Sequence, residues 1–236
     1  MFRPKISKED LSELPNIAFG GEIVVVDNYK QQSVVANYMS NYKIFGFDTE
    51  SRAVFKKGVK NSISLLQLSA GDKVFLFRLN KIHLSRKIVS FLQSPNILKI
   101  GVAVRDDIKE LQGVSDFIPH GFVDLQTIVK EWGIFDMSLQ KITAIVLKGR
   151  LSKAQRLSNW NAINLTPAQL VYGATDAWIC CQIYNKLLKV PKISLEEQEA
   201  IKKMLFEKEQ KEKLISDKHP ERKKYIRRVE ENKKIK

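Results

Sequence analysis

Two carboxylates stand at the end of an apolar run that has the composition of a β-strand. Asp48 and Glu50 close the sequence Lys43-Ile-Phe-Gly-Phe-Asp-Thr-Glu50. Successive side chains of a strand alternate between its faces, so these two carboxylates point to the same side. Like charges held close together repel, which favours a cation between them. The alternative is a pair of polar residues facing water, but apolar residues precede the acids on both faces.

A third carboxylate, Asp176, lies in a helix that the sequence predicts to begin at Pro167. Thr166-Pro167-Ala168-Gln169 supplies a capping residue, a proline at the first helical position and a reciprocating glutamine. Apolar residues cover much of the helix circumference, which indicates a largely buried helix. Burying an unpaired carboxylate costs several kcal/mol, and either a metal ion or an arginine elsewhere would remove that cost. Tyr172 precedes Asp176 by four residues, so both share one helix face.

A further acidic pair, Asp106 and Asp107, follows the apolar run 97–104 and precedes a predicted helix. Read alone, this pair is typical of a helix N-cap. Four carboxylates from separate segments could instead hold two hard divalent cations. Oxygen-only ligands select Mg²⁺ or Mn²⁺, and the chain offers no Cys/His set suited to zinc. Two such ions about 4 Å apart clamp the attacking and leaving oxygens of a phosphoryl displacement, with a nearby tyrosine hydroxyl orienting the water.

The elements that must position these side chains follow a mixed pattern. We predict strands over residues 22–27, 43–50, 61–69, 73–77 and 97–104, and helices over 31–39, 84–92, 124–132 and 138–147 and from 107 and 167 onward. Ala70-Gly71-Asp72 gives the second strand pair the spacing of a hairpin. Asp124 is interpreted as a helix cap, and Gly149 as a helix stop. Antiparallel strands followed by strand–helix alternation predict an α/β fold, a mixed β-sheet flanked by helices.

Composition and charge narrow the class of protein. The chain has 236 residues, of which 44% are hydrophobic, so it can bury a core. Its net charge of +14 favours a nucleic-acid partner, although a solubilising surface charge would look the same. Its two cysteines are adjacent, which excludes a disulfide scaffold. No apolar run approaches the roughly 20 residues that span a bilayer, and the N-terminus lacks a signal-peptide core, so we expect a cytoplasmic protein without membrane contact.

Three parts are predicted along the chain. Residues 1–21 are polar and read as an N-terminal leader, residues 22–190 as the folded domain, and residues 191–236 as a basic helical tail. A second capping box, Ser194-Leu-Glu-Glu197, begins the tail helix. After Lys218 the sequence is mostly charged and is predicted to be disordered.

The combination of these motifs resembles a known family. Phe47-Asp-Thr-Glu50, the Asp107 segment and Tyr172-Gly-Ala-Thr-Asp176 resemble, in order, the three motifs of the DEDD superfamily of 3′–5′ exonucleases. The likeness is to the branch with a catalytic tyrosine, which includes ribonuclease D and the Werner-type exonuclease domain. The strand Ser64-Leu-Leu-Gln-Leu68 and the segment Leu157-Ser-Asn-Trp160 are also similar to the family. The resemblance covers about residues 22–190 and implies a ribonuclease-H-like fold that removes nucleotides from the 3′ ends of DNA or RNA.

The resemblance also implies roles for individual residues. Asp48, Glu50 and Asp176 would hold the ion that activates water, and Asp48 would bridge to a second ion. Asp107 would contribute through that second ion, with Asp106 interpreted as a cap. Tyr172 would position the attacking water. The implied cofactor is therefore a pair of Mg²⁺ or Mn²⁺ ions.

Substrate contacts are predicted in two places. Arg150, Lys153 and Arg156 precede Trp160 in a predicted loop, and a basic run followed by an aromatic residue could grip a single strand. The alternative is a solvated loop with Trp160 in the core. The family likeness places two further residues, Gln67 and Leu68, beside the terminal nucleotide.

The main functional hypothesis is thus a metal-dependent 3′–5′ exonuclease. One alternative is a catalytically silent nucleic-acid-binding module of the same fold. Another is a structural protein that binds a partner through its C-terminal helix.

Overall fold

The computed structural model describes residues 1–52 and 63–218, and the chain divides into two compact units, Met1–Lys192 and Ile193–Lys236. In the second unit the described residues contain helix α8 (Leu195–Lys218). It begins at the predicted capping box, in which the Glu197 N–H donates to Ser194 Oγ at 3.1 Å and the Ser194 N–H donates to the Glu197 carboxylate at 2.8 Å. The disorder predicted after Lys218 and the first two residues of the predicted strand 61–69 lie outside the described residues.

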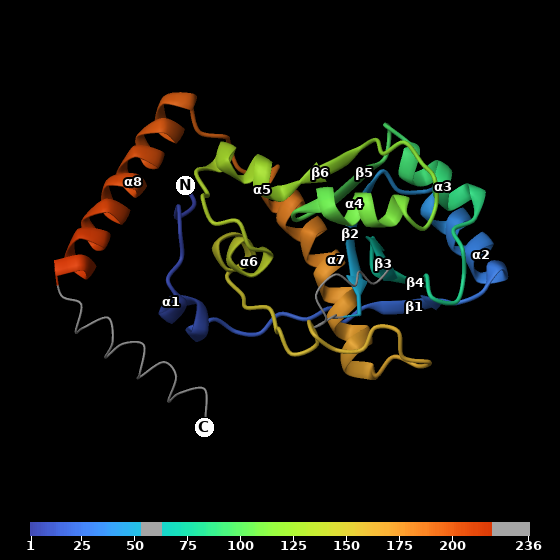
Figure 1. Cartoon of the computed structure of the whole chain (residues 1–236). Helices are drawn as coiled ribbons and strands as arrows, with labels where there is room; N and C mark the ends of the chain where they lie inside the picture. The colour runs from blue at the N-terminus through green and yellow to red at the C-terminus, as the bar shows by residue number, and fades with distance from the viewer. Residues whose placement is uncertain (53–62, 219–236) are drawn as a thin grey trace, which may run out of the picture. The chain divides into compact units, whose positions relative to one another are not determined.

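A mixed β-sheet forms the centre of the first unit (Figure 1). Its strands are β1 (Glu22–Val26), β2 (Ile44–Ser51), β3 (Ile63–Ala70), β4 (Lys73–Arg78), β5 (Leu98–Gly101) and β6 (Phe122–Asp124), in the order β1-β4-β3-β2-β5-β6. Strands β2, β3 and β4 are antiparallel, whereas β1 with β4, β2 with β5, and β5 with β6 are parallel. The predicted hairpin and mixed sheet are confirmed.

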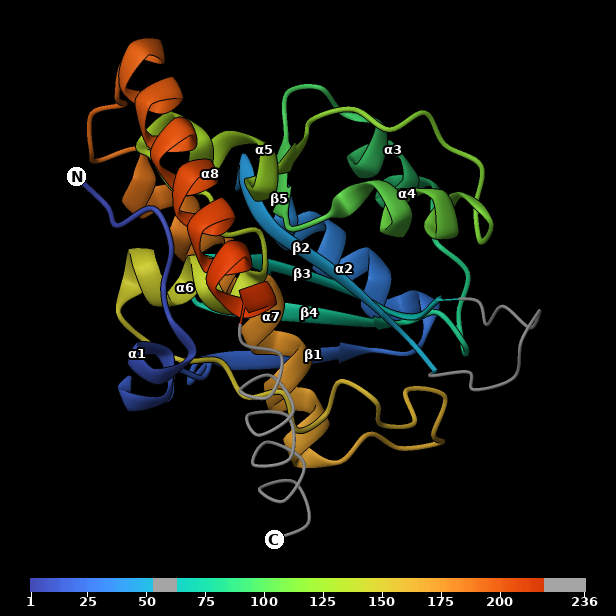
Figure 2. The same cartoon turned by 60° about the vertical axis from the view of Figure 1, so that its left-hand side comes forward.

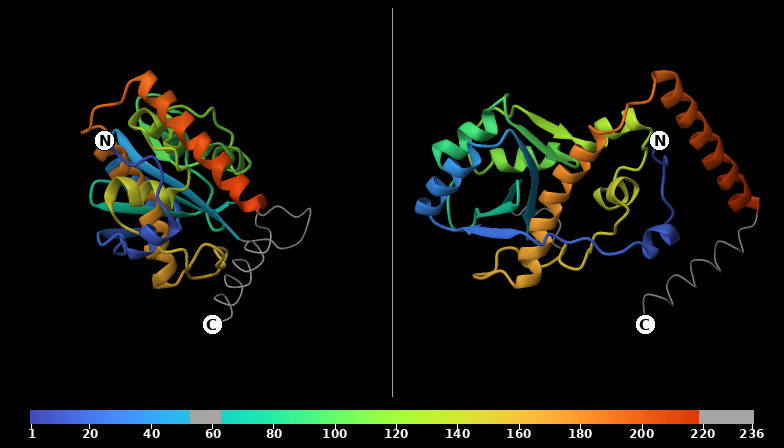
Figure 3. Two further views of the ribbon diagram at one scale, coloured as in Figure 1. Left: turned by 90° about the vertical axis from the view of Figure 1, so that its left-hand side faces the viewer. Right: turned by 180° about the vertical axis from the view of Figure 1, so that it is seen from behind.

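Helices cover both faces of this sheet. The helices described in this unit are α1 (Lys8–Glu13), α2 (Tyr29–Met39), α3 (Arg86–Gln93), α4 (Val104–Gln112), α5 (Leu125–Ile128), the 3₁₀ helix η1 (Val129–Trp132), α6 (Leu139–Leu147) and α7 (Pro167–Leu187). Figure 3 shows α2 and α3 on one side of the sheet and α7 and α6 on the other. The predicted α/β class is therefore confirmed.

Alternation along the strands divides the core between these two faces. Phe47 on β2 and Leu68 on β3 are cross-strand partners, and both belong to an apolar cluster that includes Val35 of α2 and Leu92 of α3. The opposite face packs against α7, which contacts five of the strands and crosses the sheet in Figure 2. At Gly46 a Cβ atom would lie 1.8 Å from the Ala177 carbonyl oxygen, so the close approach of helix and sheet requires glycine there.

The N-terminal segment differs from its prediction as a separate leader. It belongs to the compact unit that begins at Met1 and contains α1. The side chains of Ile6 and Phe19 are buried, and the Ile6 N–H donates to the Asp136 carboxylate at 2.8 Å. The sequence of this segment is polar overall. Its few buried residues pack against distant parts of the chain, so its membership of the folded unit could not be predicted from the local sequence.

Two element ends also differ from expectation. The strand predicted over 97–104 ends at Gly101, because the chain turns at Ala103 (φ 57°) and α4 begins at Val104. Helix α6 ends at Leu147, and its C-cap is Lys148 in the left-handed conformation, one residue before the Gly149 that was expected to stop the helix. Gly149 is instead required by space, since a Cβ atom there would lie 1.9 Å from Ile17.

None of the helices among the described residues is long and apolar enough to cross a membrane.

Candidate active site

The site forms where strand β2 extends past its shorter neighbour. Strand β5 pairs with β2 only along residues 44–46, so residues 47–51 of β2 have a strand partner, β3, on one side only. This leaves one edge of β2 open to side chains from the helices above and below the sheet. Asp48 and Glu50 face α7, whereas Thr49 faces the opposite layer, where its hydroxyl donates to Asp107 Oδ1 of α4 at 2.5 Å.

Three of the predicted carboxylates converge at this edge. One oxygen each from Asp48, Glu50 and Asp176 can be chosen so that all three lie within 4.8 Å of one another. Asp176 is buried on α7, and the two strand residues are partly exposed. Asp107 lies outside this trio but close enough for its negative charge to raise the pKa of both Asp48 and Glu50. The fold thus gathers the four acids from β2, α4 and α7.

Burial and mutual repulsion disfavour the charged forms of these acids. Burial, followed by the charges of Asp176, Asp107 and Glu50, raises the pKa of Asp48 well above its ordinary value. Burial and the charges of Asp176 and Asp107 raise the pKa of Glu50 to about 8, against a lowering effect of Arg156. Burial likewise raises the pKa of Asp107 to about 6 and that of Asp176 to about 7.

This donor set fits divalent metal ions. It consists only of carboxylate oxygens, which suit hard cations such as Mg²⁺ and Mn²⁺. The acids repel one another in partly buried surroundings, and a cation among them would reverse the rise in pKa. Asp48, Glu50 and Asp176 are positioned to hold one ion together, whereas Asp107 is held apart by Thr49 and is available to another.

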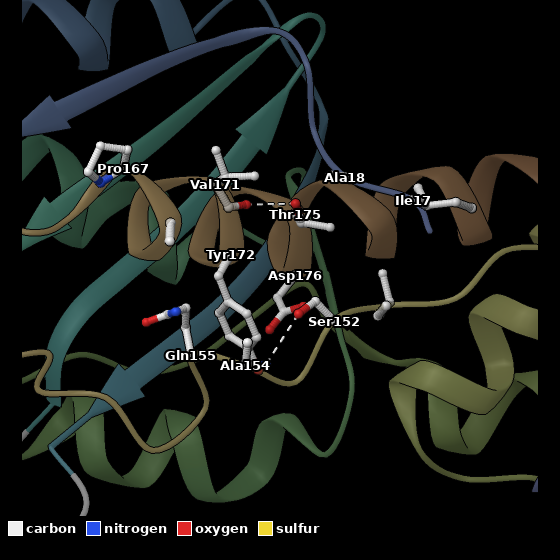
Figure 4. A pocket seen from close by; sticks show the side chains of 12 residues that line it. Ile17, Ala18, Ser152, Ala154, Gln155, Pro167, Val171, Tyr172, Thr175 and Asp176 are labelled. Atoms are coloured by element: carbon white, nitrogen blue, oxygen red, sulfur yellow. Dashed lines mark hydrogen bonds between the residues drawn. The ribbon is translucent and has the colours of Figure 1, made fainter. Parts of the chain in front are cut away.

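Tyr172 lies one helical turn before Asp176, and its hydroxyl donates a hydrogen bond to the Asp176 carboxylate. Figure 4 shows both side chains on the same side of α7, pointing toward the segment that carries Ser152 and Gln155. Burial and the nearby charges of Asp176, Glu50 and Asp48 raise the pKa of Tyr172, so the phenol stays protonated at neutral pH. It can therefore orient a water molecule but not serve as a base.

Two further acidic residues near the site, Asp124 and Asp106, do not belong to the metal-binding group. Asp124 caps α5, since its Oδ1 accepts from the Gln126 N–H at 2.9 Å, as the sequence predicted. The same oxygen accepts from the Ala103 N–H at 3.0 Å and so steadies the turn before α4. The interpretation of Asp106 as a cap was wrong: the N-cap of α4 is Ala103, and Asp106 lies exposed in the first turn.

Three of the predicted substrate contacts are buried, and the structure corrects them. Gln67, Leu68 and Trp160 are each 0% exposed, so none of them can stack on a base or meet a nucleotide. Leu68 packs in the apolar core below β2, and Gln67 lies beneath Gly173 of α7. A central strand of a sheet covered on both faces buries its side chains, whatever their chemistry.

Trp160 supports Tyr172 from within the core. The centres of their rings are 6.0 Å apart, and Trp160 lies in an apolar cluster with Leu65 and Ala174. The loop around it is tied down because Gln169 Nε2 donates to Ser158 Oγ at 2.9 Å and to the Asn159 carbonyl at 3.2 Å. The alternative placement of Trp160 in the core is the one that the structure adopts.

The three basic residues before Trp160 separate into two kinds. The Arg150 guanidinium donates to Asn16 Oδ1 at 3.0 Å and to the Ser12 carbonyl at 3.1 Å, so it holds the N-terminal segment and is not free for phosphate. Lys153 and Arg156 are exposed. Arg156 lies close enough to Glu50 to lower its pKa, which places a positive charge at the mouth of the site. Of this group, Lys153 and Arg156 remain candidates for contacts with a phosphate backbone.

A cavity of about 400 Å³ adjoins the acids and was not predicted from the sequence. Figure 4 shows the side chains around it, which are Ile17, Ala18, Leu151, Ser152, Ala154, Gln155, Pro167, Ala168, Val171, Tyr172, Thr175 and Asp176. The segments involved are far apart in the sequence and carry mostly small or apolar residues. Small and apolar residues of this kind form no sequence motif, so the cavity that they line can be recognised only in the folded chain.

Known proteins share both the sequence pattern and the fold of this chain. A family model described as 3′–5′ exonuclease matches residues 23–191. A mouse protein, the bifunctional 3′–5′ exonuclease/ATP-dependent helicase WRN, is 27% identical over 187 residues, covering 74% of this chain and 13% of the relative. The Drosophila melanogaster exonuclease 3′–5′ domain-containing protein 2 is 32% identical over 157 residues, covering 65% of this chain and 27% of the relative. The chain thus corresponds to a minor part of these curated relatives.

The fold is that of solved exoribonucleases. Escherichia coli ribonuclease D superposes with a TM-score of 0.65 at 21% identity, over 76% of this chain and 46% of that structure. The family model covers most of the chain and includes the segments that carry all four acids and the tyrosine. The chain therefore belongs to the 3′–5′ exonuclease domain family, as the resemblance of its motifs predicted.

Proposed function

We propose that the protein is a metal-dependent 3′–5′ exonuclease that hydrolyses the terminal phosphodiester bond of a nucleic acid. The observation that carries the proposal is the convergence of Asp48, Glu50 and Asp176 at the open edge of β2, with Asp107 beside them and Tyr172 one turn away. Membership of a divalent-metal-dependent family supports it. The two ions are proposed to be Mg²⁺ or Mn²⁺, because both accept carboxylate oxygens as ligands.

The chain's own residues have separate tasks in this mechanism. Asp48, Glu50 and Asp176 would hold one ion, and Asp48 with Asp107 would hold the other. Such ions, when bound, would supply a lowered pKa for a water molecule and positive charge against the phosphate. Tyr172 keeps its proton and directs the water toward the phosphorus through its hydroxyl oxygen. Exposed Arg156, at the mouth of the site, attracts the phosphate backbone.

The proposed substrate is a nucleic acid with a free 3′ end. The net charge of +14 suits such a polyanion. A ribonuclease D from Trypanosoma brucei, which has the same fold with a TM-score of 0.62 at 19% identity, was solved in complex with RNA U12. We propose single-stranded RNA or DNA as the substrate class, and we place the activity in the cytoplasm, which microscopy of the tagged full chain would test.

The deciding experiment is a panel of 5′-labelled oligonucleotides: single-stranded, double-stranded and recessed, as DNA and as RNA, each with Mg²⁺, Mn²⁺ or EDTA. We expect stepwise shortening from the 3′ end with either ion and none with EDTA. Release of nucleoside 5′-monophosphates, detected by chromatography, would confirm the bond that is cleaved. Binding without shortening in every lane would instead support the catalytically silent module.

A further inference from the structure

The N-terminal segment lies against the active site although it precedes the region that matches the family. The family match begins at residue 23. The Ile17 N–H donates to the Arg150 carbonyl at 2.9 Å, and the Arg150 N–H donates to the Pro15 carbonyl at 2.8 Å. These two hydrogen bonds form an isolated β-bridge between the segment and Arg150. Arg150 directly precedes the loop that borders the site.

Further contacts fix the segment from both sides. The Arg150 side chain donates to Asn16 and to the Ser12 carbonyl, as described above. The Phe19 N–H donates to Thr175 Oγ1 at 3.0 Å, one residue before the Asp176 carboxylate on α7. The segment is therefore hydrogen-bonded both to the loop and to the catalytic helix α7, which fixes its position beside the site.

The cavity beside the acids takes one of its walls from this segment. Ile17 and Ala18 line it together with Pro167 and Val171 of α7, and Tyr172 and Asp176 line it where it meets the metal-binding acids. These apolar walls suit the flat face of a base. A volume of about 400 Å³ is in the range of sites for one small ligand and is too small for a duplex.

One polar group in the cavity is available for recognition. The Gln155 side-chain amide makes no hydrogen bond with any residue that the structure describes, and it lines the cavity. An amide can both donate and accept, so it matches the edge of any of the bases. The cavity thus offers apolar faces and one adaptable edge contact next to the point of cleavage.

We propose that residues 15–19 form one wall of a subsite that holds a single nucleobase of the substrate, so that the N-terminal segment is part of the substrate-binding machinery. The proposal rests on the exonuclease function proposed above. It deepens that function by assigning the ligand, a nucleoside 5′-monophosphate unit, to a cavity whose wall lies outside the family match.

The test fills the cavity from its exposed wall. In the full chain, Ala18→Trp places an indole where the base would lie, at a position that is exposed to solvent. We expect the KM for a single-stranded oligonucleotide and the inhibition constant of adenosine 5′-monophosphate to rise about tenfold, with kcat changed less than about threefold. Stabilisation by Mn²⁺ in a thermal melt stays at the wild-type value, because the acids are untouched.

Two controls separate the outcomes. Val34→Trp adds the same bulk at an exposed position of α2 on the opposite side of the sheet and is expected to behave as wild type. A folded Ala18→Trp protein with unchanged KM and unchanged inhibition would overturn the subsite.

If Ala18→Trp does not fold, Gln155→Leu serves instead. We expect it to raise the KM and the inhibition constant about threefold, and unchanged values of both would overturn the proposal. Failure of the wild-type chain to shorten any oligonucleotide would reject the exonuclease function itself, an outcome distinct from these.

Discussion

The two faces of the central sheet bury different kinds of side chain at neighbouring positions of strands β2 and β3. Phe47 and Leu68 form a cross-strand pair that faces α2 and α3, and both are buried among apolar side chains. The next pair along, Asp48 and Gln67, faces α7. There the pKa of Asp48 is raised by burial and by other acids, and the Gln67 amide has no hydrogen-bond partner within the described residues. At these neighbouring positions one face buries apolar side chains, whereas the other buries a carboxyl group and an unpaired amide, which costs stability.

The sharpest way to test this contrast is to remove charge from the functional face. Asp48→Asn keeps the shape of the side chain but removes a ligand charge shared by both ions. We expect cleavage to fall at least about 10³-fold, or about 4 kcal/mol, while oligonucleotide binding is retained. Single-turnover cleavage assays and fluorescence anisotropy measure the two quantities. Cleavage at the wild-type rate would contradict the assignment of Asp48 as a metal ligand.

The opposite face should respond in the opposite way. Leu68→Ala leaves a cavity in the apolar core, and we expect it to lower the free energy of unfolding by about 3 kcal/mol. The folded fraction should keep a kcat close to that of wild type, because Leu68 is buried away from the acids. Urea unfolding followed by circular dichroism gives the first quantity. A large loss of kcat at full folding would break the proposed division between the faces.

Tyr172→Phe tests a residue whose ring packs in the core and whose hydroxyl lies in the active site. The ring packs near Trp160, and only the hydroxyl reaches Asp176. We expect the variant to keep its thermal stability and its Mn²⁺ binding while kcat falls by about 10²-fold, as for other positioned catalytic groups. Trp160→Leu is the matched comparison, since it should lower stability as well as kcat. An unchanged kcat for Tyr172→Phe would remove the hydroxyl from the mechanism.

The smallest expected effect is the pH dependence of stability without metal. Glu50, Asp176 and Asp107 have pKa values of about 8, 7 and 6, all above those of an unfolded chain. The folded state therefore binds more protons between about pH 4 and 8, so the free energy of unfolding should fall as the pH rises through this range. Saturating Mn²⁺ should reverse this trend. Urea unfolding at pH 5.5 and 7.5, with EDTA or Mn²⁺, tests it, and a rise of stability with pH in EDTA would contradict it.

Sequence reasoning was sufficient for five of the six strands that the structure describes and for the acids that follow them. It missed β6, which has only three residues, and helix α1 in the polar N-terminal segment. Strand β2 combines an apolar run on both faces with two acids on one side, for which a cation is the favourable partner. Tyr172 and Asp176 are four residues apart, so they share one face of any α-helix. The choice of Asp107 over Asp106 came from the family resemblance. The structure brings Asp107 to Thr49 and leaves Asp106 exposed, because the turn at Ala103 shifts the start of α4.

The substrate contacts could not be predicted in the same way. Trp160 and Gln67 carry chemistry that suits a nucleotide, but their burial depends on α7 and on the loop that Gln169 holds. Conversely, Ile17 and Ala18 carry no chemical signal and reach the site only through the backbone bonds to Arg150. Gln67 meets Gly173, and Ile17 meets Arg150, across more than a hundred residues of sequence. The bonds that hold the loop around Trp160 join residues ten and eleven apart in an irregular segment.

The short length of β5 has a second consequence, for solubility. A strand edge without a partner can pair with the edge of another chain and so start aggregation. The open edge of β2 carries Asp48 and Glu50, with Asp107 and Asp176 beside it, and pairing with the same edge of a second molecule would bury these carboxyl groups further at a cost in desolvation. The carboxylates that draw cations toward the strand therefore also keep neighbouring copies of the protein from joining their sheets through it.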